Sequence, residues 1–132
     1  MTSQPHDAVP VFQGPDITAE ITTATGTVVC AFAGALHADN EEHVRRALAQ
    51  ALNRRPALLV VHLASVDLFT SSALNMLLIA RRRATADGVP LVLAEPSRIV
   101  QRVLRITEAD LVLPVYASVE RAVRHQQRSP SV

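Results

Sequence analysis

The sequence predicts an α/β fold whose sheet is mixed but mostly parallel, with about five strands and about four helices in the order β-β-α-β-α-β-α-β-α. Short apolar runs alternate with segments in which apolar residues recur at helical spacing, as in parallel α/β sheets. The first two apolar runs are separated only by a short turn that contains glycine, which is typical of a hairpin. The 132 residues, 48% of them hydrophobic, suit a single domain with one core.

The first half of the chain predicts a hairpin followed by a helix. Residues 17–22 and 27–33 have strand composition, with the turn at 24–26 and a connecting turn at 34–38. We expect Asp39 to cap the next helix, with Glu42 as its capping-box partner. Pro56 ends this helix, because proline cannot continue it. One face of the helix carries its apolar residues, Val44, Ala47, Leu48, Ala51 and Leu52.

The second half predicts three strands that alternate with helices. Residues 58–63 are nearly all apolar, which is typical of a parallel strand covered on both faces. The next helix follows the polar residues 70–72, turns Leu74, Leu77 and Leu78 inward and ends near Gly88. Residues 89–94 predict a buried strand, and residues 113–116 a short edge strand. Ser97 caps a helix that carries Ile99, Val100, Val103 and Leu104, and Ser118 caps the last helix.

The two ends of the chain differ in composition from its middle. Residues 1–15 contain three prolines and a glycine, which predicts a flexible arm before a domain at 16–125. Residues 126–132 predict a flexible tail. The first ten residues lack the basic and apolar regions of a signal peptide, and no apolar run is long enough to span a bilayer. We therefore expect a cytoplasmic protein with no membrane contact.

The composition favours binding or regulation over catalysis. A net charge of +1 predicts no strong attraction to nucleic acid, and the consecutive arginines at 81–83 point in different directions on a helix. The five histidines and Cys30 lack metal-ligand spacing; we expect Cys30 in the core and His62 as a hydrogen-bonded core histidine. The chain has no glycine-rich nucleotide loop and no G-x-S-x-G motif around Ser71, so we expect no cofactor.

Three hydroxyl side chains, Thr70, Ser71 and Ser72, separate the central apolar run from the helix that follows. This places them at the carboxyl edge of the sheet, where open α/β folds carry their functional groups. The start of a helix also favours negative charge, including phosphate. The pattern fits an anion-binding turn or a serine that is phosphorylated, with a plain helix cap as the competing interpretation of Ser71. Asp67 nearby is expected to be an exposed turn carboxylate.

The stretch from 58 to 79 resembles the STAS domain, and within that family the bacterial anti-sigma factor antagonists. Their signature, roughly V-x-F-x-D-S-S-G-L between a strand and a helix, corresponds here to VDLFTSSAL at 66–74. Further similarities lie at 82–91, at 95–104, where Glu-Pro-Ser precedes Val-Leu, and at 111–123. In order and spacing the likeness covers residues 16–125, which implies a single STAS-like domain.

The resemblance implies regulation by partner switching. In the family, the unphosphorylated antagonist binds an anti-sigma factor that is also a serine kinase of the GHKL type, and so frees a sigma factor. Phosphorylation of the antagonist blocks this binding, and a phosphatase resets it. By position Ser71 is the implied phosphoacceptor, ahead of Thr70 and Ser72, in a protein that is a monomer or a weak dimer and not an enzyme. The implied partner-binding residues are His37, Asp39, Asp67, Thr70, Ser71, Ser72, Ala73 and Asn75.

Three positions depart from the family pattern. Thr70 stands where the family has Asp, Ala73 stands where it has Gly, and an acidic G-E-L-D-like segment is replaced by Gly-Ala-Leu-His at 34–37. These departures leave open an antagonist that is always active instead of a phosphorylated one. They also leave open a STAS scaffold in a larger signalling or lipid-transport complex. An enzyme with a Ser71 nucleophile is disfavoured by the missing G-x-S-x-G motif.

Overall fold

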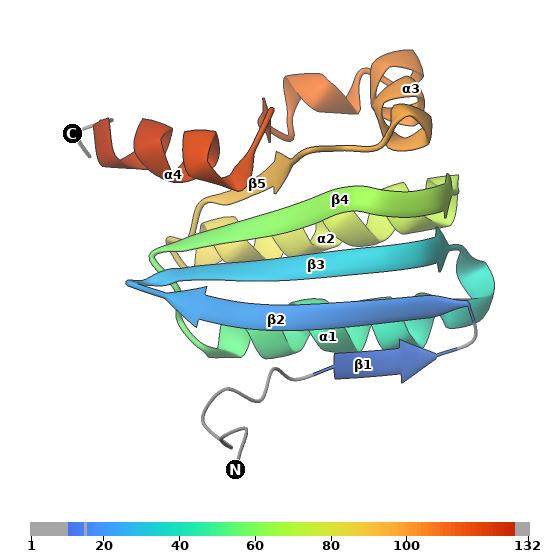
Figure 1. Ribbon diagram of the computed structural model, residues 1–132, viewed down its shortest axis with the longest axis horizontal. Helices are drawn as coiled ribbons and strands as arrows, with labels where there is room; N and C mark the ends of the chain where they lie inside the picture. Colours follow the sequence, from blue (N-terminus) through green and yellow to red (C-terminus); the bar gives the residue numbers. More distant parts are fainter. Residues whose placement is uncertain (1–10, 15, 129–132) are drawn as a thin grey trace, which may run out of the picture.

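Six strands form one mixed sheet in the computed structural model, and their spatial order β1-β2-β3-β4-β5-β6 is also their order along the chain (Figure 1). The structure describes residues 11–14 and 16–128. β1 to β3 pair antiparallel, and β3 to β6 pair parallel. The strands are β1 (Val11–Gly14), β2 (Ile17–Ala24), β3 (Thr27–Leu36), β4 (Leu58–Phe69), β5 (Leu91–Ala94) and β6 (Val115–Tyr116).

The helices cover the two faces of the sheet unequally. Behind the sheet in Figure 1 lie α1 (Glu41–Asn53) and α2 (Ser71–Ala86), side by side and in contact with each other. α3 (Arg98–Ile106) packs at the β4 side through Val100 and Leu104. α4 (Val119–Arg128) contacts β4, β5 and β6 on the opposite face. The predicted α/β class and element order are thus confirmed, with one strand added before the hairpin.

The main core lies between the sheet and the pair α1 and α2. All five apolar residues predicted on one face of α1 are buried, and so is Cys30 of β3. Aliphatic side chains supply most of this core, and removing each from water contributes about 1.5–3 kcal/mol. A smaller cluster lies under α4 and consists of Leu58, Val60, Val92, Ala94 and Ala122. β5 and residues 58–61 of β4 therefore bury both faces, as their continuous apolar runs predicted.

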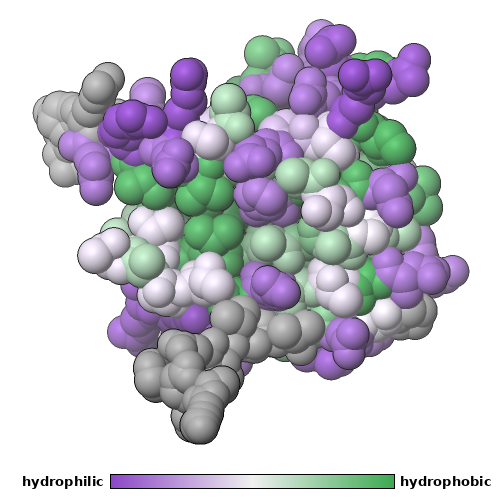
Figure 2. Space-filling model, in the orientation of Figure 1, coloured by the Kyte–Doolittle hydropathy of each residue, from purple (hydrophilic) through white to green (hydrophobic). Residues whose placement is uncertain are grey.

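None of the helices in the described part of the chain covers the outer face of β2 and β3. Thr18, Glu20, Ala31 and Ala33 lie there as neighbouring strand pairs, and all four are at least partly exposed. Figure 2 shows mostly pale colours, with some purple, across this part of the surface; Thr18, Ala31 and Ala33 have small side chains, while Glu20 is charged. His62 of β4 pairs with Ala31 and is half-buried, with its Nε2 3.4 Å from Glu95 Oε2, so the interpretation of His62 as a core histidine is wrong.

The two central strands are longer than predicted. β3 continues through residues 34–36, which were expected to form a turn, and β4 continues past Leu63 to Phe69. Leu36 and Phe69 are both buried and are paired across the two strands. Burial of this pair keeps the added residues of β3 and β4 in the sheet, although the register of the two strands shifts near Gly34. Asp67 is therefore an exposed strand residue and not part of a turn.

The boundaries at both ends also differ from the prediction. Residues 11–14 pair with β2 as strand β1, so the flexible arm is wrong for these residues, while residues 1–10 and 15 lie outside the described part. α4 continues to Arg128, so the predicted tail is wrong for 126–128, and residues 129–132 are not described. Ile99 is exposed and not part of the core. Gly88 follows α2 with φ +77°, as expected for a glycine after a helix.

Candidate functional site

The carboxyl ends of β3 and β4 lie side by side and bring two loop segments together. β3 ends at Leu36, and the short 3₁₀ turn η2 (Ala38–Asn40) follows it. β4 ends at Phe69, and Thr70 leads directly into α2. Because the strands are parallel, the residues after them meet at one edge of the sheet. His37 and the hydroxyl residues 70–72, far apart in sequence, therefore become neighbours.

Thr70 is the residue that caps α2. Its Oγ1 accepts a hydrogen bond from the Ala73 N–H at 3.3 Å and donates one to the Leu36 backbone oxygen at 3.3 Å. The interpretation of Ser71 as a plain helix cap is therefore wrong, because the capping hydroxyl belongs to the residue before it. Thr70 performs this role without a carboxylate, which accounts structurally for a threonine at this position.

Ser71 is the first residue of α2 and is exposed. Its side chain forms no hydrogen bond with any residue that the structure describes. Ser72 is half-buried, and Ala73 is completely buried in the core. The core thus accepts the methyl group of Ala73, and this side chain is not part of the exposed surface.

The loop after β3 is fixed by an asparagine that the sequence analysis missed. Asn40 is fully buried; its Nδ2 donates to the Ala35 oxygen at 2.7 Å, and its Oδ1 accepts from the His37 N–H at 3.1 Å. His37 caps the turn, because its Nδ1 accepts from the Asp39 N–H at 3.1 Å. Asp39 is therefore not the cap that we expected. Glu42 is not its capping-box partner either, but pairs with Arg45 at 2.6 Å.

Asp16 approaches the same loop from the start of β2. Its Oδ2 lies 3.8 Å from His37 Nε2, and its backbone oxygen accepts from the Ala35 N–H at 2.8 Å. Gly34 makes this approach possible, because it has φ +102° and any Cβ on it would collide with the Asp16 oxygen. The glycine thus sets the position of His37 relative to the start of α2.

Together these segments enclose a shallow hollow of about 300 Å³, lined by His37, Ala38, Asp39, Thr70 and Ser72. No acidic residue lies in the first turn of α2, so its partial positive charge is not neutralised from within the helix. The hollow combines this helix end with one histidine and one exposed carboxylate. We call the surface formed by His37, Asp39, Thr70, Ser71, Ser72 and Asn75 the Ser71 corner.

The structure brings together most, but not all, of the residues that the sequence singled out. Ser71 lies beside the hollow, and Asn75 is exposed one turn further along α2. Asp67 is exposed on β4 but does not line the hollow. The sequence analysis missed Ala38, Asp16 and Asn40. Asn40 stands among polar residues that are typical of a helix start, so nothing in the sequence indicated that its side chain would be buried.

Within the described residues, no three histidine, cysteine or carboxylate side chains lie close enough to hold a metal ion. None of the described helices is long and apolar enough to cross a membrane. The chemistry available at the Ser71 corner is therefore that of a free hydroxyl, a helix N-terminus and the side chains around them.

Comparison with known proteins places this arrangement in a family. The STAS domain family matches residues 18–122. An anti-sigma factor antagonist from Mycobacterium paratuberculosis has a similar structure, with 22% identity and a TM-score of 0.70 over 85% of this chain and 96% of that one. The anti-sigma factor antagonist SpoIIAA in its unphosphorylated form has 19% identity and a TM-score of 0.70, over 86% and 99%.

A second structure of SpoIIAA is also similar. It shows this Bacillus cell fate determinant in the phosphorylated form, with 19% identity and a TM-score of 0.62 over 81% of this chain and 97% of that one. No curated protein sequence matches this chain. At these identities the structural likeness establishes the fold, and the family match covers most of the sequence. The chain belongs to the STAS domain family.

Proposed function

We propose that this protein is an anti-sigma factor antagonist that binds an anti-sigma factor through the Ser71 corner and thereby releases a sigma factor. The observation that carries the proposal is the division of roles between two adjacent hydroxyls. Thr70 caps α2, while Ser71 is exposed with its hydroxyl uncommitted to the fold. The similar structures from Mycobacterium paratuberculosis and of SpoIIAA are described as anti-sigma factor antagonists, which supports the same role here.

Ser71 is the proposed phosphoacceptor. A phosphate adds about −1.5 to −2 charges at neutral pH. At the first position of α2 this charge meets the positive end of the helix dipole, with no acidic residue in the first turn to oppose it. Phosphorylation is therefore compatible with the fold and acts on the partner. Thr70 is less suited, because its hydroxyl holds the cap.

The same charge explains how phosphorylation would end binding. A partner that covers the Ser71 corner removes Ser71 from water, and Asp39 already contributes a carboxylate at the rim of the hollow. Burying an unpaired charge is far more costly than burying a neutral hydroxyl. The proposed partner is a serine kinase of the GHKL type that brings its own ATP, and a phosphatase restores the free hydroxyl.

We assign the protein a binding role and not an enzymatic one, acting in the cytoplasm. A nucleophilic serine needs a base within hydrogen-bond reach. Among the described residues none forms a hydrogen bond with the Ser71 hydroxyl, and His37, the histidine that lines the adjacent hollow, uses Nδ1 to cap its own turn. An exposed serine without a base is suited to receiving a phosphate from a partner.

The test is incubation with candidate anti-sigma kinases and Mg-ATP, followed by intact mass, site mapping and a binding assay. We expect one added phosphate at Ser71, loss of kinase binding after modification, and no phosphate on the Ser71→Ala variant. Phosphate at Thr70 or Ser72 would overturn the choice of acceptor. Unchanged mass with retained binding would identify an antagonist that is always active. A stable high-mass assembly that binds no anti-sigma factor would support a scaffold instead.

A further inference from the structure

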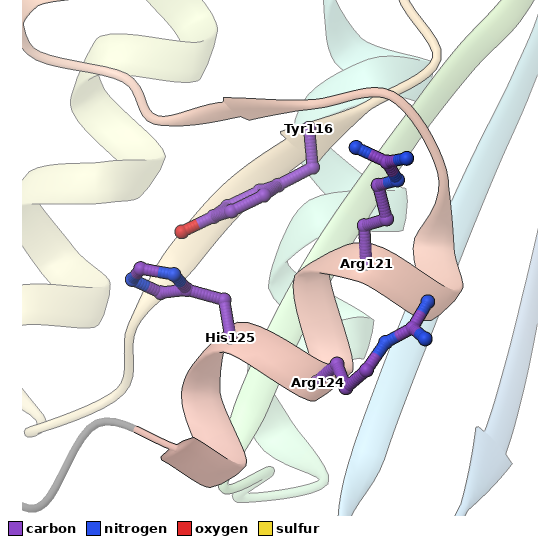
Figure 3. A pocket seen from close by; sticks show the side chains of 4 residues that line it. All are labelled: Tyr116, Arg121, Arg124 and His125. Carbon is purple, nitrogen blue, oxygen red and sulfur yellow. The ribbon is translucent and has the colours of Figure 1, made fainter.

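A second hollow, with a volume of about 360 Å³, opens between β6 and α4. Its lining consists of Tyr116 from β6 and of Arg121, Arg124 and His125 from α4 (Figure 3). The volume falls at the lower end of the range of about 300–1,000 Å³ that is typical of small-ligand sites. None of its lining residues belongs to the Ser71 corner, so the two sites are separate.

The charged side chains that line this hollow are all positive. Arg121 and Arg124 are three residues apart on α4, so they project from the same side of the helix. Neither guanidinium forms an ion pair or hydrogen bond with any described residue, although Glu120 precedes Arg124 by one turn. No carboxylate of the described residues lines the hollow. Two guanidinium groups that have no counter-charge from residues 11–14 or 16–128 therefore line the same hollow.

Arginine is the side chain best suited to phosphate. Its planar group carries several N–H donors, always keeps its charge and can donate two parallel hydrogen bonds to one oxyanion. A single exposed arginine is common on protein surfaces and indicates nothing. Two of them beside one hollow, one helical turn apart and without a described carboxylate in its lining, supply the charge and the N–H donors that a doubly charged anion requires.

The opposite wall of the hollow is aromatic. The rings of Tyr116 and His125 lie 5.3 Å apart between centroids and are tilted by 47°. Figure 3 shows the two rings on one side and both guanidinium groups on the other, with the tyrosine hydroxyl directed toward the histidine. A tilted ring pair of this kind offers an apolar surface for a further ring, together with polar donors at its edge.

We propose that this hollow, between β6 and α4, binds a small phosphorylated molecule that carries a ring. The phosphate pairs with Arg121 and Arg124, and the ring packs against Tyr116 and His125. The site is independent of the proposed anti-sigma function, because it uses other residues on another side of the sheet. Such a ligand gives the domain an input that is separate from phosphorylation at Ser71.

Phenyl phosphate is the simplest probe that combines both chemistries. In a two-dimensional amide NMR titration of the full chain, we expect saturable shifts at Tyr116 and along α4, and tighter binding than that of inorganic phosphate. The double variant Arg121→Gln/Arg124→Gln should bind phenyl phosphate about tenfold more weakly or worse, since each charge-assisted hydrogen bond contributes about that factor. Both arginine side chains lie on the exposed side of α4, so the fold should be retained.

The matched control is Arg98→Gln/Arg102→Gln, which removes the same charge from two exposed positions of α3 that do not line the hollow. This control should bind phenyl phosphate as the natural protein does. Equal weakening in both double variants would show general attraction to positive charge and overturn the site. Absence of saturable shifts at Tyr116 and α4 would also overturn it. Equal affinities for phenyl phosphate and inorganic phosphate would overturn the assigned role of the ring pair.

Discussion

Thr70 and Leu36 are joined by two hydrogen bonds at the edge of the sheet. The Thr70 N–H donates to the Leu36 oxygen at 3.2 Å, and the Thr70 hydroxyl donates to the same oxygen at 3.3 Å. That hydroxyl also accepts from the Ala73 N–H, so it ties the ends of β3 and β4 to the start of α2. Ser71, the next residue, makes none of these contacts. Thr70 holds the corner together, and Ser71 faces the solvent.

The first prediction tests this division. Thr70→Ala should lower the free energy of unfolding by about 1 kcal/mol, because it removes a helix cap. Ser71→Ala should change it by less than about 0.5 kcal/mol, as is usual for an exposed side chain. Urea denaturation followed by circular dichroism measures both. Thr70→Ser keeps the hydroxyl and should recover most of the loss. An equal cost for the two alanine variants would contradict the assigned roles.

Ser71→Glu should keep the fold and abolish binding to the anti-sigma factor. A carboxylate at the start of α2 interacts favourably with the helix dipole, so the free energy of unfolding should stay equal or rise by about 0.3–1 kcal/mol. The matched control is Thr85→Glu, which places the same charge on an exposed position in the last turn of α2. It should be slightly destabilising and should bind the partner normally. Normal binding by Ser71→Glu would refute the corner as the docking surface.

Gly34 and Gly88 both have a positive φ, so alanine substitutions at these two positions can be compared directly. Gly34→Ala should cost about 3 kcal/mol or more, because a positive φ is combined with a collision at the Asp16 oxygen. Gly88→Ala should cost only about 1 kcal/mol, since Gly88 has a similar φ but nothing within 4 Å of the added Cβ. Thermal and urea unfolding measure the difference. Equal losses would show that the approach of Asp16 to β3 is not tight.

Cys30 predicts a loss of stability in alkaline solution. Burial raises the pKa of its thiol from 9.0 to about 12, because the charged thiolate is poorly solvated in the core. Between these values the unfolded chain loses the proton and the folded protein keeps it. The free energy of unfolding should therefore fall by about 1.4 kcal/mol per pH unit in that window.

Urea titrations at several pH values across that window measure the slope. Cys30→Ala is the control, because it removes the thiol and leaves the other titrating groups in place. The alanine variant should show a slope that is shallower by that amount. Identical slopes for the two proteins would mean that the Cys30 thiol has the same pKa in the folded and unfolded states. That result would contradict the effect of burial on its pKa.

The sequence predicted those parts of the fold where one physical signal dominates. The apolar face of α1 and the apolar run at 58–63 were identified correctly, because hydrophobic spacing alone determines them. The strand predicted at 89–94 also exists, but it begins two residues later, at Leu91. Ser97 was identified correctly as the residue that caps a helix. In each case the decisive neighbours lie within a few residues along the chain.

The errors arose where distant contacts decide. β3 reaches Leu36 and β4 reaches Phe69 because these two residues pair with each other, and neither segment alone shows it. β1 exists because β2 offers it a free edge. His37, and not Asp39, caps its turn because Asn40 is drawn inward by the Ala35 oxygen. The local composition predicted loops at 11–14 and 34–36 and an acidic helix cap at Asp39. Hydrogen bonds to distant parts of the chain determine a different local structure at all three places.

The match between strand order in the sheet and strand order in the chain has a consequence for biosynthesis. Every strand after β1 finds its partner in the segment that the ribosome has just released. Assembly can thus proceed from the amino-terminal hairpin outward, and no strand has to wait for a distant one before it can pair. The parallel pairings from β3 to β6 each span an intervening helix or loop, so we expect the antiparallel hairpin of β2 and β3 to form before them.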